Sequence, residues 1–250
     1  MHKKHNFIQY PIFDAFNNLV AFTSTKQSFN TEKTRFTGDT PDIFEENRIH
    51  LAKMLGIEVR QLIFPRQTHT NCVAEIAEIP ECELKETDAL ITDKTGICIC
   101  VQTADCVPVL LFEPEKCVIA AIHAGWRGTV KKIAAETVQK MVSNYQCDPA
   151  KIVAAIGPSI SPAVYEVGSE VTDAIHQSIP NPDKVIHPKE TGKHHVDLWA
   201  ANREVLIEAG LKPENIEIAE ECSFTDTERF FSARKEGADT GRMVSGIMIK

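Results

Sequence analysis

Short apolar runs alternate with polar breaks along most of the chain. The runs are rich in Val and Ile and are bounded by turn-forming residues, a pattern that favours strands over helices. We expect ten strands, at residues 19–23, 61–66, 72–76, 89–92, 97–102, 107–112, 117–122, 152–156, 216–219 and 244–249.

Helices are expected between these strands, at residues 42–55, 129–142, 169–179 and 197–209. The first of them stops before Gly56, and the last begins at Asp197 and stops before Gly210. These residue types commonly cap and end helices. Residues 26–41 and 179–195 are polar, and we expect them to form long loops.

Many strands combined with several helices indicate an α/β (α+β) fold, a sandwich whose helices cover the outer faces of the sheets. A chain of 250 residues is long enough for one large domain or two small ones. The chain has no internal repeat, and neither long loop resembles a flexible linker. We therefore expect a single domain over residues 1–250.

The composition is that of an ordinary globular protein, with 43% hydrophobic and 25% charged residues. The net charge is −8 and no cluster of Lys or Arg stands out, so neither nucleic acid nor a membrane surface is an expected partner. The basic start of the chain lacks the apolar core of a secretory signal, and no stretch approaches the length of a membrane span. We expect a cytoplasmic protein whose eight cysteines are reduced.

The segment at residues 103–129, TADCVPVLLFEPEKCVIAAIHAGWRGT, places reactive side chains at the ends of two apolar runs. If the two runs form an antiparallel hairpin that turns at residues 113–116, Cys106 lies directly opposite His123. Opposed side chains in such a hairpin are about 4.5–5.5 Å apart. This separation suits two ligands of one metal ion, or a thiol–imidazole pair, provided that no bulge changes the register.

A third ligand is needed, and His69 is the best candidate because it follows the end of an expected strand among polar residues. One thiolate and two imidazoles form a ligand set that suits Zn²⁺, and copper is also possible. Three protein ligands leave one coordination position open, which is the pattern of catalytic rather than structural zinc. Water in that position would have a lowered pKa.

Other interpretations of the same residues stay open. On pattern alone, Cys106 is more typical of a buried core cysteine than of a ligand. His123 also fits a hydrogen-bonded histidine at a sheet edge, and His69 fits a surface loop. In a cysteine hydrolase, Cys106 would be the nucleophile and His123 its base. The protein would otherwise be a metal-dependent amidase, or a binding module whose metal is structural. A multicopper oxidase is disfavoured, because none of the nine histidines forms a His-x-His pair.

Several short motifs occur in a fixed order: QTH at 67–69, TDAL at 87–90, TADCVP at 103–108, HAGWRG at 123–128, IGPSI at 156–160, YEVG at 165–168, FSAR at 231–234 and TGR at 240–242. With these motifs the chain resembles the YfiH/YlmD laccase-domain family, also called the purine nucleoside phosphorylase family of that type. The resemblance runs from about residue 17 to the C-terminus. The pair ADC-x-P and HAGWRG is highly specific, and the other motifs are weaker.

The resemblance implies a four-layer α/β/β/α sandwich with mixed sheets. It also implies that His69, Cys106 and His123 hold a zinc ion. The activity associated with the family is phosphorolysis of adenosine, inosine and S-methyl-5′-thioadenosine, with adenosine deamination alongside. Other labels used for the family are copper-dependent polyphenol oxidase and peptidoglycan editing, the hydrolysis of a wrongly built cell-wall precursor. The implied partners are small molecules, a purine nucleoside and phosphate, and the oligomeric state stays open.

Further residues are candidates for a role in this chemistry. Asp105, next to the cysteine, is expected to act as a proton shuttle or to orient a ligand histidine. Arginine donates two hydrogen bonds at once to an oxyanion, and an aromatic ring can stack on a base. The candidates for substrate binding are Arg48, Gln67, Trp126, Arg127 and Arg234.

Overall fold

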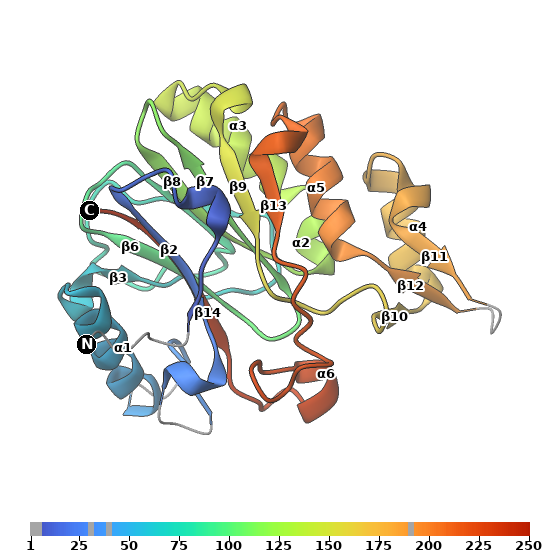
Figure 1. The fold of residues 1–250 in the computed structure, drawn as a ribbon, viewed down its shortest axis with the longest axis horizontal. Helices are drawn as coiled ribbons and strands as arrows, with labels where there is room; N and C mark the ends of the chain where they lie inside the picture. Colours follow the sequence, from blue (N-terminus) through green and yellow to red (C-terminus); the bar gives the residue numbers. More distant parts are fainter. Residues whose placement is uncertain (1–6, 30–32, 39–41, 190–192) are drawn as a thin grey trace.

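The computed structural model describes residues 7–29, 33–38, 42–189 and 193–250. Two mixed sheets form its centre (Figure 1). In spatial order, the five-stranded sheet consists of β1 (Phe7–Ile8), β2 (Leu19–Ser24), β14 (Met243–Ile249), β6 (Cys98–Thr103) and β3 (Leu62–Ile63). The six-stranded sheet consists of β13 (Ile216–Ile218), β9 (Val153–Ile156), β7 (Val107–Glu113), β8 (Val118–Ala124), β5 (Ala89–Thr92) and β4 (Val73–Glu75).

A small third sheet lies to one side and consists of β10 (Glu166–Val167), β12 (His194–Val196) and β11 (Ile186–Pro188). The α-helices are α1 (Asp42–Leu55), α2 (Trp126–Val130), α3 (Ile133–Tyr145), α4 (Ser169–Ser178), α5 (Leu198–Glu208) and α6 (Ala233–Glu236). Short 3-10 helices occur at Pro11–Phe13, Lys26–Ser28, Val59–Gln61, Pro149–Lys151, Pro182–Lys184 and Pro213–Asn215. None of the described helices is long and apolar enough to cross a membrane.

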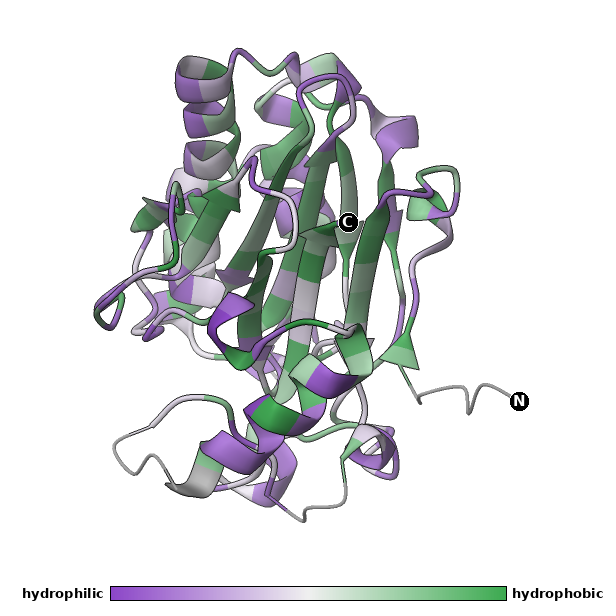
Figure 2. Ribbon diagram, turned by 90° about the vertical axis from the view of Figure 1, so that its left-hand side faces the viewer, coloured by the Kyte–Doolittle hydropathy of each residue, from purple (hydrophilic) through white to green (hydrophobic). Residues whose placement is uncertain are grey.

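Three apolar cores separate four layers. The two large sheets pack face to face, with Leu110 and Ile119 of one against Ile99 and Ile247 of the other. Helices α3 and α5 cover the outer face of the six-stranded sheet, and α1 covers the five-stranded sheet through residues such as Leu51. Figure 2 shows the resulting apolar strands between more polar helices. The α/β/β/α sandwich expected from the sequence is confirmed.

This layering explains the continuous apolar runs in the sequence. Every residue of β7 and of β8 is buried, because both faces of the six-stranded sheet are covered. Strands in such a position lose the alternation of polar and apolar residues that marks a half-exposed sheet. All ten expected strands form, although the one expected at 61–66 shortens to β3.

Two expectations about the elements are wrong in detail. The single helix expected at 129–142 is divided into α2 and α3, because Lys132 takes a left-handed backbone conformation with φ of 57°. The long loop expected at 179–195 contains β11 and the start of β12, so it is partly a sheet. In the loop expected at 26–41, residues 30–32 and 39–41 lie outside the described part of the chain.

The expected register of the β7–β8 hairpin is also wrong. His123 pairs with Pro108 rather than with Cys106, and Glu113 pairs with Val118. The turn is longer than expected because Cys117, with φ of 54°, belongs to it instead of starting β8. The error is two residues, and side chains alternate faces with a period of two. Cys106, the residue before β7, therefore still lies on the same face of the hairpin as His123.

Candidate metal centre

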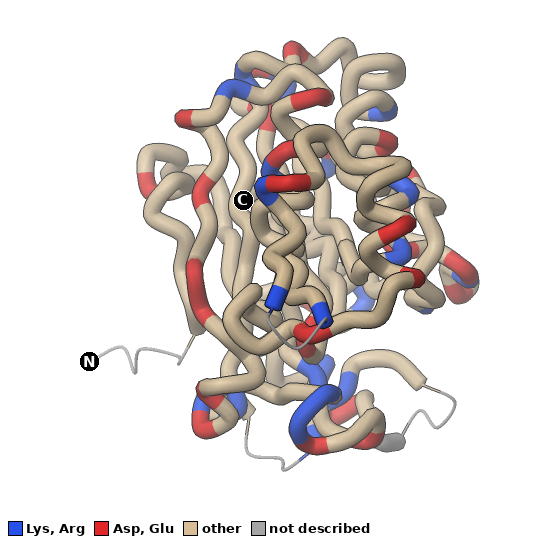
Figure 3. The backbone as a smooth tube through the Cα atoms, turned by 90° about the vertical axis from the view of Figure 1, so that its right-hand side faces the viewer, with Lys and Arg blue, Asp and Glu red and all other residues tan. Residues whose placement is uncertain are grey.

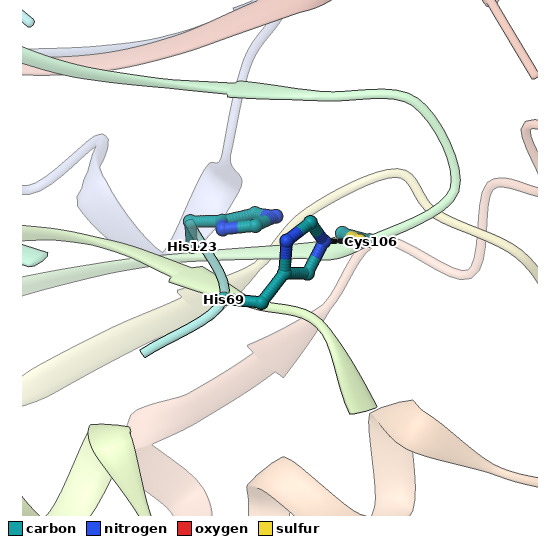
Figure 4. A group of neighbouring side chains, drawn as sticks. All are labelled: His69, Cys106 and His123. Atoms are coloured by element: carbon teal, nitrogen blue, oxygen red, sulfur yellow. Dashed lines mark hydrogen bonds between the residues drawn. The ribbon is translucent and has the colours of Figure 1, made fainter. Parts of the chain in front are cut away.

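The three candidate ligands converge at one end of the sandwich. His69 lies in the loop after β3, Cys106 immediately precedes β7, and His123 lies near the end of β8. Their ligand atoms all lie within 4.8 Å of one another. Cys106 Sγ is 3.8 Å from His69 Nε2, and the imidazole rings meet edge to face with centroids 4.8 Å apart. Figure 4 shows the side chains directed toward a common point.

Gly125 makes the room for this convergence. It follows β8 and is the N-cap of α2, with ordinary backbone angles, so its conformation does not require glycine. A Cβ atom at this position would lie 3.0 Å from Cys106 Sγ and 3.0 Å from His69 Cδ2. The glycine in the HAGWRG motif is therefore needed because a side chain would collide with two of the candidate ligands.

Asp88 orients two of the three ligands from behind. Its carboxylate is fully buried and lies 2.7 Å from Nδ1 of His123, which leaves Nε2 of that ring directed toward the ligand cluster. The same carboxylate accepts hydrogen bonds from the backbone N–H of His69 and the hydroxyl of Thr70. A carboxylate behind a metal-bound histidine fixes its tautomer and ring orientation. The sequence motif TDAL contains Asp88, but the motif alone assigns it no role.

Electrostatic interactions favour the metal-binding form of the cysteine. Burial on its own would raise the pKa of the Cys106 thiol, but the charge and hydrogen bonds of His123 and His69 lower it to about 6. Burial would lower the pKa of His123, but Cys106 and Asp88 raise it to about 9. Burial would raise the pKa of the Asp88 carboxyl, yet its hydrogen bonds with His123 and Thr70 hold that pKa well below the usual range. Thiolate is the form in which cysteine binds metal.

Asp105 does not orient a ligand histidine, contrary to one of the roles expected for it. One of its carboxylate oxygens accepts a hydrogen bond from Ser223 Oγ at 2.7 Å, and the other accepts one from the backbone N–H of Arg234 at 2.7 Å. Its backbone is left-handed, with φ of 80°. Asp105 therefore ties the turn before Cys106 to the start of α6, and Asp88 performs the orienting role.

The substrate-binding candidates divide between separate regions. Gln67 lines a cavity together with all three candidate ligands, but both ends of its amide are hydrogen-bonded to the backbone of Gln102. Arg48 lines a different cavity, where its guanidinium donates to the carbonyl of Phe36 and lies over the ring of Phe44. Of these two residues, only Gln67 is brought to the candidate metal site.

Trp126 and Arg234 line a third cavity, of about 410 Å³, that also contains Tyr165. The guanidinium of Arg234 donates to the carbonyl of Glu166 and lies 5.4 Å from the centre of the Tyr165 ring. Arg127 is exposed, and its guanidinium lies 4.4 Å from the centre of the Trp126 ring. None of these residues lines the cavity that contains the metal ligands.

The cavity at the candidate metal site has a volume of about 410 Å³ and three arginines that sequence reasoning did not select. They are Arg35, Arg66 and Arg242. Arg242 belongs to the TGR motif, which offered a signal, whereas Arg35 lies in a region without a motif. Tertiary structure alone brings Arg35 to this cavity.

The residues present fit a metal ion. His69, Cys106 and His123 are the only group of three potential ligands that lies close enough for one ion among the described residues. A thiolate with two imidazoles suits a borderline-soft ion such as zinc, and the ligands border a cavity that leaves room for a further ligand. A carboxylate already orients His123, as is usual behind a metal-bound histidine.

Comparisons with known proteins find relatives along most of the chain. A purine nucleoside phosphorylase from Bacteroides thetaiotaomicron is 37% identical over 99% of this chain and 97% of its own length. Adenosine deaminase RL5, from an unknown prokaryotic organism, is 41% identical over 86% of this chain and 85% of its own length.

Solved structures share the fold along the whole chain. YfiH from Bacillus licheniformis superposes with a TM-score of 0.89 at 27% identity and covers 99% of this chain and 98% of its own. YlmD from Geobacillus stearothermophilus gives a TM-score of 0.89 at 26% identity, with 100% and 98% covered. Residues 21–250 match the family described as multi-copper polyphenol oxidoreductase laccase, and the chain belongs to that family, which the sequence motifs also indicated.

Proposed function

We propose that the protein is a zinc-dependent purine nucleoside enzyme, which carries out phosphorolysis of adenosine, inosine and S-methyl-5′-thioadenosine and also deaminates adenosine. The observation that supports it most strongly is the convergence of His69, Cys106 and His123 at a cavity of about 410 Å³. Cavities of roughly 300–1,000 Å³ accommodate small organic ligands. The names of two relatives, a purine nucleoside phosphorylase and an adenosine deaminase, favour this substrate class.

Each residue of the site has a role in this proposal. His69, Cys106 and His123 would hold the zinc ion, which when bound supplies Lewis acidity and activates water near neutral pH. Asp88 keeps His123 in one tautomer and fixes the backbone of His69. Asp105, the residue before Cys106, stays our candidate for proton transfer.

The direct test is to incubate the purified protein with inosine and phosphate, and separately with adenosine, and to measure hypoxanthine, adenine and inosine by chromatography. We expect Cys106→Ala to abolish both reactions. Cys82→Ala is the matched control, because Cys82 is exposed and does not border the metal-site cavity. Activity that persists unchanged in Cys106→Ala would refute the proposal.

A second candidate function is a cysteine hydrolase, which includes hydrolysis of a cell-wall precursor. It is favoured by the lowered pKa of Cys106, about 6, beside an imidazole with a raised pKa, since this pairing activates a nucleophilic thiol. Iodoacetamide would inactivate such an enzyme even after treatment with a chelator, and chelation itself would leave its activity intact. The zinc-dependent enzyme is expected to lose activity on chelation and to recover it when zinc is added.

The same site offers little support for a multicopper oxidase. Such enzymes need several copper ions, and the described residues contain one group of potential ligands rather than several. Copper in the single site is tested by adding Cu²⁺ or Zn²⁺ to the chelated protein and assaying nucleoside turnover with each. We expect zinc to restore the activity.

A further inference from the structure

The cavity at the metal site differs in charge from the rest of the molecule. The chain carries a net charge of −8, and on the face shown in Figure 3 basic residues are interspersed with acidic ones. The described residues that line this cavity nevertheless include Arg35, Arg66 and Arg242 and no Asp or Glu. Apart from Cys106, which would bind the metal ion, the charged side chains of this lining are arginines, and a basic lining concentrates anions.

Two of these arginines meet at a single neutral acceptor. Arg35 Nη2 and Arg242 Nη1 both donate to the carbonyl oxygen of Thr240, at 3.2 Å and 2.6 Å. Arg242 donates further to the carbonyls of Gly241 and Ala238, each at 2.9 Å. The carbonyls orient the guanidiniums but carry no charge that could neutralise them.

The carboxylate paired with Arg35 compensates its charge only weakly. Asp239 lies 3.7 Å from Arg35, and its side chain is 98% exposed, so solvent screens the interaction. Burial lowers the pKa of Arg242 and the neighbouring charge of Arg35 lowers it further, and the opposing effects of Cys106, Asp105 and Asp239 do not offset this. Two like charges held together in this way are stabilised when an anion binds between them.

A buried hydroxyl at the same cavity also lacks a partner. Thr103 is 1% exposed and lines the cavity, and its Oγ1 has no hydrogen-bond partner within the described structure. A buried polar group without a partner is unusual and often marks a functional site. Thr103 therefore places an unpaired hydroxyl at the same cavity as the arginines.

We propose that Arg35 and Arg242 form the subsite for the phosphate ion that is consumed in phosphorolysis, an inference that rests on the proposed function for the identity of the anion. In this reaction a phosphate oxygen forms a bond to C1′ of the ribose. The bond from C1′ to N9 breaks with its electron pair on the purine, and a proton from the phosphate ends on the purine. The products are the free base and ribose 1-phosphate.

This subsite replaces the arginines selected from the sequence. Arg48 lies in another cavity, while Arg127 and Arg234 lie on the side of Trp126 and Tyr165. Adenosine deamination consumes no phosphate. Substitutions at the subsite are therefore expected to separate the two activities.

The first experiment measures binding of radiolabelled inorganic phosphate to the purified protein by equilibrium dialysis. We expect Arg35→Gln to weaken phosphate binding by about tenfold or more, because it removes a charge-assisted donor. Arg242→Lys, which keeps the charge but removes the guanidinium, is the second variant. Arg60→Gln is the control, since Arg60 is paired with Glu58 at an exposed site outside this cavity.

The second experiment compares the kinetics of the same variants. We expect KM for phosphate in inosine phosphorolysis to rise about tenfold or more in Arg35→Gln, with deamination of adenosine changed less than twofold. Equal losses in both reactions, or phosphate binding unchanged in both arginine variants, would overturn the subsite. A wild-type protein that binds phosphate through these arginines but releases no free base would instead refute the proposed function and leave an anion site in place.

Discussion

At the scale of single residues, the site depends on atoms that never touch the proposed ion. Asp88 holds the ring of His123 and the backbone on both sides of His69 with one carboxylate. Gly125 contributes only the absence of a side chain. Substituting either residue therefore tests the architecture of the site without removing a ligand.

Asp88→Asn is expected to weaken zinc affinity by about 10–100-fold, the usual effect of losing a residue that orients a metal ligand. Both carboxylate oxygens of Asp88 accept backbone N–H hydrogen bonds, and one of them also faces His123. An asparagine amide has only one accepting oxygen, so it cannot keep all of these bonds. Affinity is measured by competition with a chromophoric chelator. Asp93→Asn, at a surface ion pair with Lys94, is the control. Wild-type affinity in Asp88→Asn would contradict the orienting role.

Gly125→Ala is expected to lower the metal content of the purified protein while the fold is retained. The new Cβ would approach both Cys106 Sγ and His69 Cδ2 to 3.0 Å and force the ligands apart. Metal per chain is measured by mass spectrometry of the element, and folding by near-ultraviolet circular dichroism. Gly38→Ala is a matched control, because its Cβ would meet nothing closer than 4.0 Å. Equal metal content in the two variants would argue against the collision.

At the scale of elements, the strands were predictable from the sequence because they are buried on both faces, and the helices from their spacing and caps. Asp197 caps α5 as expected, through a hydrogen bond with Ala200. The division between α2 and α3 was not predictable, since nothing in the residue type of Lys132 demands a left-handed backbone. The small third sheet was missed because strands of two or three residues show no periodicity.

The site was predictable to the extent that it sits at strand ends. Cys106 and His123 adjoin long apolar runs, so even a register error of two residues kept them on one side of the sheet. Asp88 and Arg35 reach the site only through contacts between distant segments. The TDAL motif contains Asp88 without assigning it a role, and no motif contains Arg35. Arginines selected for residue type alone, such as Arg48, lie elsewhere.

The short helix α6 provides an element-scale prediction about pH. Lys26 Nζ lies 2.5 Å from Glu236, whose other carboxylate oxygen accepts from Ser232 and Thr240. Burial would raise the pKa of Glu236, but Lys26 and the other donors lower it. A lowered carboxyl pKa stabilises the folded state above the unfolded pKa of about 4.3, and that contribution is lost as pH falls through the folded value.

Lys26→Met is therefore expected to reduce the free energy of unfolding at pH 7 by about 0.2–1 kcal/mol, a small value because both side chains are partly exposed. The difference from wild type should shrink as the pH falls below about 4. Urea unfolding at several pH values measures it. Lys151→Met, which breaks a more exposed pair with Glu115, should have a smaller effect at pH 7. A Lys26→Met difference of the same size at pH 3 would contradict the interpretation.

At the scale of the whole molecule, the proposed ion would join the two large sheets. His123 belongs to the six-stranded sheet, His69 follows a strand of the five-stranded sheet, and Cys106 lies on the connection between the sheets. A ligand that binds only the folded state raises its stability according to its concentration relative to Kd. Zinc should therefore stabilise the entire sandwich rather than one loop.

Chelation is expected to lower the melting temperature by about 5–11 °C. Zinc at a free concentration of about 100 Kd stabilises the folded state by about 2.7 kcal/mol, and each kcal/mol shifts the melting temperature by about 2–4 °C in a chain of this length. Differential scanning calorimetry with and without chelator measures the shift. The Cys106→Ala variant, which lacks the thiolate, should show almost none. An identical shift in that variant would place the stabilising metal elsewhere.

The most direct test of the site is the X-ray absorption spectrum of zinc in the purified protein. We expect one sulfur ligand at about 2.3 Å and two imidazole nitrogens at about 2.0–2.1 Å, with a remaining light-atom ligand from solvent or substrate. A spectrum without sulfur, or one with two or more sulfur ligands, would contradict the assignment of His69, Cys106 and His123 as the zinc ligands.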